Sequence, residues 1–168
     1  MGKNMLVRRV AKTAVALGVA LGASLGSANA ASAAPINEMT CKYPDGSYNI
    51  CITITDMGND IYNVHVGIDV DMSQSQAQAI INRPGNAFIA DMRASDPSFD
   101  NFIGWITHTS EGVGPNGIGA DFDALFSGDL LDEDWPDSDE VYARVRLYQT
   151  PTTTSPRTFT SNKIEHSF

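Results

Sequence analysis

Large apolar and polar or small side chains alternate along two neighbouring stretches of the chain, residues 48–55 and 62–72. A period of two is typical of a β-strand that buries one face and leaves the other in water. A segment rich in turn-forming residues, 56–60, separates the two stretches. The pattern therefore predicts a β-hairpin with one wet face.

A short helix is predicted next, over about residues 73–82, because Ser73 and Gln76 have the spacing of a capping box. Alternation then returns in further segments, which we interpret as strands: 87–93, 102–109, 118–126, 141–148 and about 157–164. Residues 111–119 contain four glycines and one proline, which predicts an exposed loop. Seven or eight short strands with one small helix indicate an all-β fold, an antiparallel immunoglobulin-like β-sandwich.

Two resemblances accompany this pattern. Residues 131–147 resemble the approach to strand F of fibronectin-type and immunoglobulin-like domains, with Tyr142 as the corner tyrosine whose hydroxyl bonds to upstream backbone. The chain is also similar to small exported actinomycete proteins of unassigned function, in the segments Asp71-Met72-Ser73, Gln76-Ala77, Asp139-Glu140-Val141-Tyr142 and Ser161-Asn162-Lys163-Ile164. These resemblances imply an exported β-sandwich and no particular activity.

Residues 1–33 are interpreted as a secretory signal peptide. A basic start precedes an uncharged stretch, and the small residues that follow include two A-x-A sites, which end at Ala30 and Ala33. The alternative is a membrane anchor over 13–34, but few of its side chains are strongly apolar. We expect cleavage after Ala33, which leaves a secreted single domain, 34–168, with no membrane span.

The net charge of the whole chain is −9. All 20 acidic side chains lie beyond residue 33, together with seven basic ones, so the processed chain carries −13. This charge excludes a nucleic-acid binder that neutralises phosphates and a polybasic protein of the membrane surface.

The only two cysteines, Cys41 and Cys51, lie in the predicted secreted part. Because oxidising compartments favour disulfides, we expect these two to be bridged. Directly opposed residues of a hairpin share a constant sum of residue numbers, and this pair predicts a five-residue loop at 44–48 or a bulge beside a tighter turn.

The densest charge in the sequence is seven acids among the twelve residues 129–140. Oxygen-rich loops suit Ca²⁺, and the candidate ligands are Asp129, Asp132, Asp134, Asp137 and Asp139. The segment lacks the glycine of an EF-hand, and Pro136 interrupts it. The alternative is a solvated acidic turn without metal. No other cofactor is expected.

Several other side chains are candidates for chemistry or for binding. His65, Asp69 and Asp71 share one strand face, but the rise along a strand separates them too far for one zinc ion, which indicates a wet sheet face. The chain has no G-x-S-x-G motif, so a serine with His65 or His108 is a weak candidate and no catalytic residue is assigned. The aromatic residues that would form a sugar or peptide platform are Trp105, Trp135 and Tyr148, of which Trp135 is expected to be the most exposed.

The leading hypothesis is therefore a secreted, acidic, monomeric binding module for an extracellular protein, peptide or glycan, with residues 129–140 as contact or calcium site. The second is a secreted protease inhibitor that presents the 111–119 loop. A small secreted hydrolase comes third, and an enzyme is the less favoured class.

Overall fold

The computed structural model describes residues 36–95, 100–132, 138–148 and 155–168. The predicted signal peptide, 1–33, lies outside these ranges and stays a prediction. Within the described residues the chain forms nine strands and two short helices: β1 (Asn37–Lys42), β2 (Tyr48–Gly58), β3 (Ile61–Asp71), α1 (Gln74–Ile81), β4 (Phe88–Ser95), β5 (Asp100–Gly114), β6 (Gly117–Ser127), α2 (Gly128–Leu131), β7 (Asp139–Leu147), β8 (Arg157–Thr160) and β9 (Ile164–His166). Neither helix has the length and hydropathy that a bilayer crossing requires.

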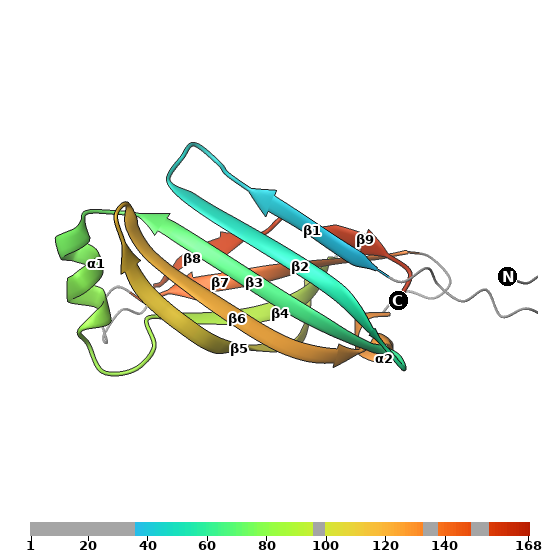
Figure 1. Ribbon diagram of the computed structural model, residues 1–168. Coiled ribbons are helices and arrows are strands. Elements are labelled where there is room, and N and C mark those ends of the chain that lie inside the picture. Colours follow the sequence, from blue (N-terminus) through green and yellow to red (C-terminus); the bar gives the residue numbers. More distant parts are fainter. Residues whose placement is uncertain (1–35, 96–99, 133–137, 149–154) are drawn as a thin grey trace, which may run out of the picture. The chain divides into compact units, whose positions relative to one another are not determined.

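The strands form one antiparallel sheet in the order β1-β2-β3-β6-β5-β4-β7-β8, with β9 also paired to β7. Strand β5 is long enough to pair with β4 at its start and with β6 at its end. The sheet therefore curls at β5 into a half-barrel, with β1, β2, β3 and β6 in front of β4, β7 and β8 (Figure 1). The all-β, antiparallel prediction is confirmed, with one or two more strands than expected.

The core lies between the two layers because alternate side chains of each strand point inward. In the front layer these are Ile50, Ile52 and Ile54 on β2 and Val64 and Val66 on β3, all fully buried. The back layer contributes buried side chains from β4 and β7: Phe88, Ala90, Met92, Val141, Ala143, Val145 and Leu147. The other side chains of the same strands form two outer faces.

The predicted hairpin and helix are confirmed. Strands β2 and β3 pair over their whole length around a turn at Asn59 and Asp60. At the start of α1 the Ser73 hydroxyl accepts a hydrogen bond from the backbone N–H of Gln76. In return, the Gln76 side-chain oxygen accepts one from the backbone N–H of Ser73. This reciprocal capping box fixes the start of the helix where the sequence predicts it.

The exposed loop predicted for 111–119 is wrong. Strand β5 runs to Gly114 and β6 begins at Gly117, so only two residues connect them. The four glycines lie in the strands, and at Gly117 and Gly119 the missing side chain permits close approach of atoms from β3. A Cβ added at Gly117 would lie 2.0 Å from the carbonyl oxygen of Val70. The acidic segment also differs from expectation, because it opens with a helical turn, α2.

Candidate functional site

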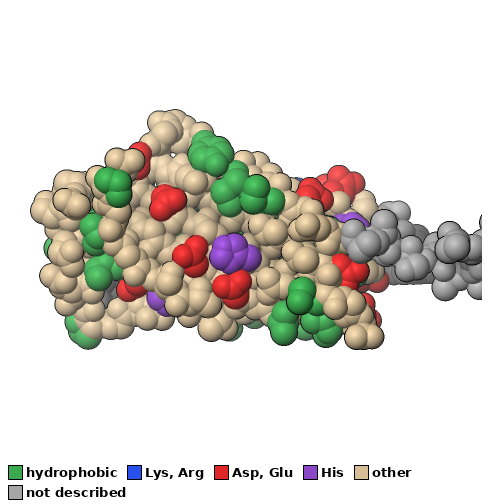
Figure 2. All heavy atoms as spheres, viewed as in Figure 1, with side chains coloured by type: hydrophobic (Ala, Val, Ile, Leu, Met, Phe, Trp, Pro, Cys, Tyr) green, Lys and Arg blue, Asp and Glu red, His purple; other side chains and the backbone are tan. Residues whose placement is uncertain are grey.

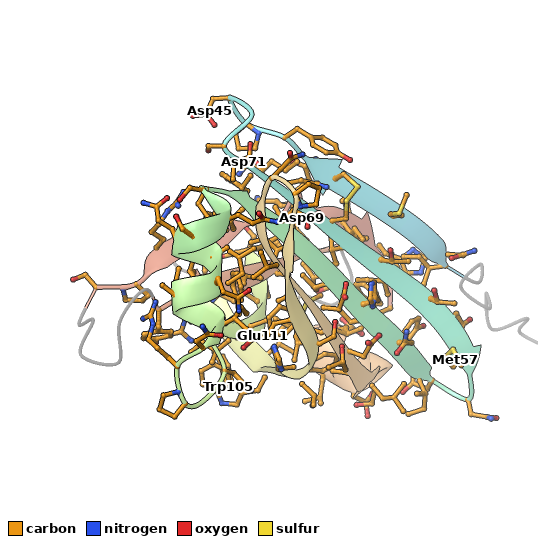
Figure 3. The ribbon with its side chains drawn as sticks, turned by 60° about the vertical axis from the view of Figure 1, so that its left-hand side comes forward. Asp45, Met57, Asp69, Asp71, Trp105 and Glu111 are labelled. Carbon is orange, nitrogen blue, oxygen red and sulfur yellow. A yellow bond between two sulfur atoms is a disulfide. The ribbon has the colours of Figure 1, made fainter. Side chains whose placement is uncertain are left out.

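The two outer faces of the sheet carry different chemistry. We call the outward side chains of β4, β7 and the first half of β5 the arginine face: Asp91, Arg93, Phe102, Trp105, Arg144 and Arg146. We call the outward side chains over β3, β6 and the second half of β5 the acidic face: His65, Asp69, Ser110, Asp121 and Asp123. In Figure 3, Asp71 and Asp69 of β3 lie in the upper part of the view, whereas Trp105 lies at its lower edge.

Asp91 is the centre of the arginine face. The register places it between Trp105 on β5 and Arg144 on β7. Its side chain is 0% exposed and accepts from three guanidinium groups. Arg93 Nε lies 2.8 Å from Asp91 Oδ1, and the Nη2 atoms of Arg144 and Arg146 each lie 2.9 Å from Oδ2. Such charge-assisted bonds compensate for the desolvation of a buried carboxylate.

Two exposed aromatic rings adjoin this cluster. Trp105 is 59% exposed and Phe102 is 48% exposed. Their centroids lie 5.3 Å apart in an edge-to-face arrangement. The guanidinium of Arg146 lies 5.3 Å from the Trp105 ring centroid, within the range of a cation–π contact. The rings therefore present apolar surface to water while the arginine holds one of them in place.

Tyr142 borders the same face, opposite Arg93 in the register. Burial raises the pKa of its hydroxyl to about 12, and the hydrogen bond to the Asp100 side chain and the charge of Asp100 act in the same direction. The nearby Arg93 and Arg144 lower the pKa by a smaller amount. Arg93 Nη1 also donates to the backbone oxygen of Asp100, at 3.1 Å. These bonds tie the start of β5 to the arginine cluster.

The acidic face is wet, as the sequence predicts. In Figure 2 carboxylates surround a histidine on the face turned to the viewer. His65 Nδ1 lies 2.9 Å from Asp123 Oδ1, and both side chains are 43% exposed. Its Nε2 lies 3.9 Å from Asp121, which accepts from the hydroxyl of Ser110 at 2.8 Å. The sequence did not predict the β6 carboxylates Asp121 and Asp123 at this site, because they come from a strand that pairs with β3 but is distant in sequence.

A shallow groove of about 450 Å³ crosses the acidic face. Four of its lining residues have no side chain, namely Gly67, Gly112, Gly114 and Gly119. A Cβ added at Gly119 would lie 2.7 Å from Asp69 Oδ1, so the missing side chain gives the Asp69 carboxylate its place. Water therefore reaches this face between its charged side chains.

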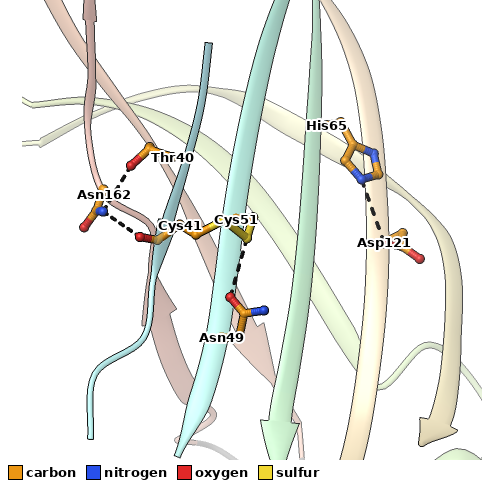
Figure 4. The surroundings of a disulfide bond; sticks show 7 residues. All are labelled: Thr40, Cys41, Asn49, Cys51, His65, Asp121 and Asn162. Atoms are coloured by element: carbon orange, nitrogen blue, oxygen red, sulfur yellow. Dashed lines mark hydrogen bonds and ion pairs between the residues drawn. A yellow bond between two sulfur atoms is a disulfide. The ribbon is translucent and has the colours of Figure 1, made fainter. Parts of the chain in front are cut away.

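The predicted disulfide is confirmed. Cys41 and Cys51 are bridged and directly opposed in the β1–β2 ladder. Beside the bridge, the Asn162 side-chain amide donates to Thr40 Oγ1 at 3.1 Å and to the carbonyl oxygen of Cys41 at 2.9 Å (Figure 4). These bonds join β1 to the segment between β8 and β9, so side chains connect the two ends of the curled sheet.

The candidate calcium ligands are only partly visible. Asp129 is exposed on α2, Asp132 follows that helix, and Asp139 is buried at the start of β7. Asp134 and Asp137 lie outside the described residues, as does Trp135. In the part of the chain that is described, no three acidic, histidine or cysteine side chains lie close enough to hold a metal ion. Calcium binding by residues 129–140 stays a prediction.

The other candidates from the sequence are His108, Tyr148 and Trp105. His108 lies 3.2 Å from the Glu111 carboxylate and contacts the Phe122 ring edge to face. Tyr148 is half-buried. Trp105 is 59% exposed, and the prediction that Trp135 is the most exposed aromatic of the platform stays a prediction.

Comparisons of the chain with protein-family models, with curated proteins and with solved structures find no match.

Proposed function

We propose that residues 34–168 form an exported binding module that recognises an extracellular protein or peptide through the arginine face. The observation that carries the proposal is the pair of exposed rings, Phe102 and Trp105, beside three arginines. Tryptophan and arginine are the residues most enriched at the energetic centres of protein interfaces. Exposed apolar surface that is ringed by polar groups is typical of a contact site.

Preorganisation supports the same proposal. Binding costs free energy when long side chains must be ordered at the interface. Here Arg144 and Arg146 are already held by Asp91, and Trp105 is held by Arg146. A partner therefore meets side chains whose ordering has largely occurred during folding.

An experiment with matched exposed positions tests this function. A phage-displayed library of random peptides is selected on the wild-type domain, on Trp105→Ala and on Leu125→Ala, since Leu125 is 66% exposed on the opposite outer face. We expect the wild type and Leu125→Ala to enrich the same peptides and Trp105→Ala to lose them. Enrichment of the same peptides by all three proteins, or by none, contradicts the proposal.

The finer assignments belong to this proposal as well. They are export with cleavage after Ala33, an immunoglobulin-like sandwich arrangement, a monomeric state and calcium binding by residues 129–140. Two layers of antiparallel strands support the sandwich assignment. Melting curves with millimolar Ca²⁺ and with chelator test the metal, because a ligand of the native state raises the melting midpoint. An unchanged midpoint contradicts calcium binding and leaves the arginine face untouched.

The inhibitor hypothesis stays a prediction, but the loop named for it is not formed. Residues 111–119 are a two-residue hairpin connection with its flanking strands. The arginine face is therefore the surface on which we place the binding function.

A further inference from the structure

We infer that the partner of the arginine face is an acidic segment of a protein, in which carboxylates flank an apolar side chain. This inference rests on the proposed binding function and specifies its ligand. The first argument is charge. Three guanidinium groups surround the carboxylate of Asp91, and Asp100 adds a second carboxylate beside Arg93 and Tyr142, so one positive charge remains in excess.

That excess is unusual for this chain. Residues 34–168 contain seven basic and 20 acidic side chains, and three of the seven basic ones meet at Asp91. The acidic face on the other layer carries Asp69, Asp121 and Asp123. An anionic partner is therefore attracted to the arginine face and repelled by the acidic face, which orients the encounter.

The second argument is the geometry of the donors. A guanidinium has five N–H donors in a planar fork that matches a carboxylate. Asp91 Oδ2 accepts hydrogen bonds from both Nε and Nη2 of Arg144, but only from Nη2 of Arg146. The side chains of Arg93, Arg144 and Arg146 are 17%, 26% and 21% exposed, so parts of all three remain open to a ligand. Asp91 shows that the cluster accommodates a carboxylate, and carboxylates of a partner would extend the same network outward.

The third argument concerns the aromatic pair. Phe102 and Trp105 give the face an apolar part next to its charged part. A ligand with charge alone would leave both rings in water, whereas a segment with an apolar side chain between its carboxylates contacts both parts. The short extent of the positive cluster also favours a short segment, because a long polyanion would continue onto the acidic remainder of the domain.

Fluorescence anisotropy with defined probes tests the inference. The probe is a short labelled peptide with glutamates on both sides of one leucine, and its comparison carries glutamine in place of each glutamate. We expect the glutamate peptide to bind at low salt and to weaken as salt is added. The Kd should rise about tenfold or more in Arg146→Gln and in Trp105→Ala. Arg83→Gln, an equal change of charge at the end of α1, should leave the Kd unchanged.

The outcomes separate this inference from the proposed function. Equal binding of the glutamate and glutamine peptides, both lost in Trp105→Ala, overturns the acidic ligand and keeps the binding face. Tighter binding of heparin than of the peptide, with the same dependence on Arg146, overturns the protein segment in favour of a sulfated glycan. A dimer in sedimentation that dissociates in Trp105→Ala assigns the face to a second copy and also overturns the inference. Unchanged circular dichroism of each variant shows that a lost signal is not a lost fold.

Discussion

The two outer faces of the sheet each contain a nitrogen-to-carboxylate contact with the same 2.9 Å separation, and the surroundings of the two contacts differ. On the acidic face, His65 and Asp123 are both 43% exposed. On the arginine face, Asp91 is 0% exposed and its partner Arg144 is 26% exposed. Exposed pairs contribute little because water and salt screen them, whereas a buried charge that loses its partners is costly. Distance alone therefore does not rank these interactions.

The neighbouring side chains explain the difference in burial. On the acidic face, the groove beside Asp121 is lined in part by glycines, which leave room for water. Around Asp91, long arginine side chains and the Trp105 ring lie on the adjacent strands. Arginine covers apolar or polar surface with its methylene stem while its head stays partly hydrated. Two faces of one sheet thus differ in dielectric surroundings because of side-chain size.

The largest expected effect is that of Asp91→Asn. The substitution leaves three guanidinium groups around a neutral amide. Removal of one partner of a buried ionic cluster costs about 3–5 kcal/mol. We expect the free energy of unfolding in urea to fall by that amount. Asp121→Asn on the acidic face is the matched control, and its expected cost is below about 1 kcal/mol. Equal losses in the two variants would show that burial does not distinguish the faces.

Much of the fold was predictable from the sequence, since the alternation that forms β2 and β3 is local. The register of Cys41 with Cys51 also follows from two residue numbers. The arginine cluster was not predictable in this way. Asp91 and Arg144 are 53 positions apart, and each reads as part of a wet strand face. Only the pairing of β4 with β7 brings them together, and alternation does not specify which strands become neighbours.

The glycines of 111–119 illustrate a second limit. Glycine predicts a loop from backbone freedom, but it also allows atoms to approach a strand closely. At Gly117 and Gly119 the nearby groups are the Val70 carbonyl and the Asp69 carboxylate. Because these contacts come from another strand, β3, the sequence of the segment alone favoured the wrong structure.

The second-largest loss of stability is expected when the disulfide is removed. It closes a loop with a sequence separation of 10 between β1 and β2 of the front layer. A loop of this length corresponds to about 2–3 kcal/mol in the chain-entropy model. We expect the double variant Cys41→Ser, Cys51→Ser to unfold at lower urea concentration by that free energy, and reduction of the wild type to have the same effect. A double variant as stable as the oxidised wild type would remove the bridge from the list of stabilising interactions.

The pH dependence of stability provides a test at Tyr142, which borders the arginine face. Its folded pKa of about 12 lies above the ordinary value of 10.0, so the folded state favours the protonated hydroxyl. This contribution to stability is complete below pH 10 and is lost as pH rises towards 12. Tyr142→Phe should remove this part of the pH dependence and cost about 1 kcal/mol at neutral pH through the lost hydrogen bond. Absorbance at alkaline pH should show one late-titrating tyrosine fewer in the variant. An unchanged titration curve would assign the late tyrosine elsewhere.

The smallest effect is expected for His65 and Asp123. A double-mutant cycle of His65→Gln and Asp123→Asn isolates their coupling, which should be below about 1 kcal/mol and decrease with added salt. Salt should matter here because ions reach both side chains, whereas the coupling of Asp91 to Arg144, measured by the same cycle with Arg144→Gln, should change little. A strong, salt-independent coupling on the acidic face would mean that water does not screen the pair, although both side chains are 43% exposed. In that event, the difference between the faces would have to come from the number of charges at each site rather than from access of water.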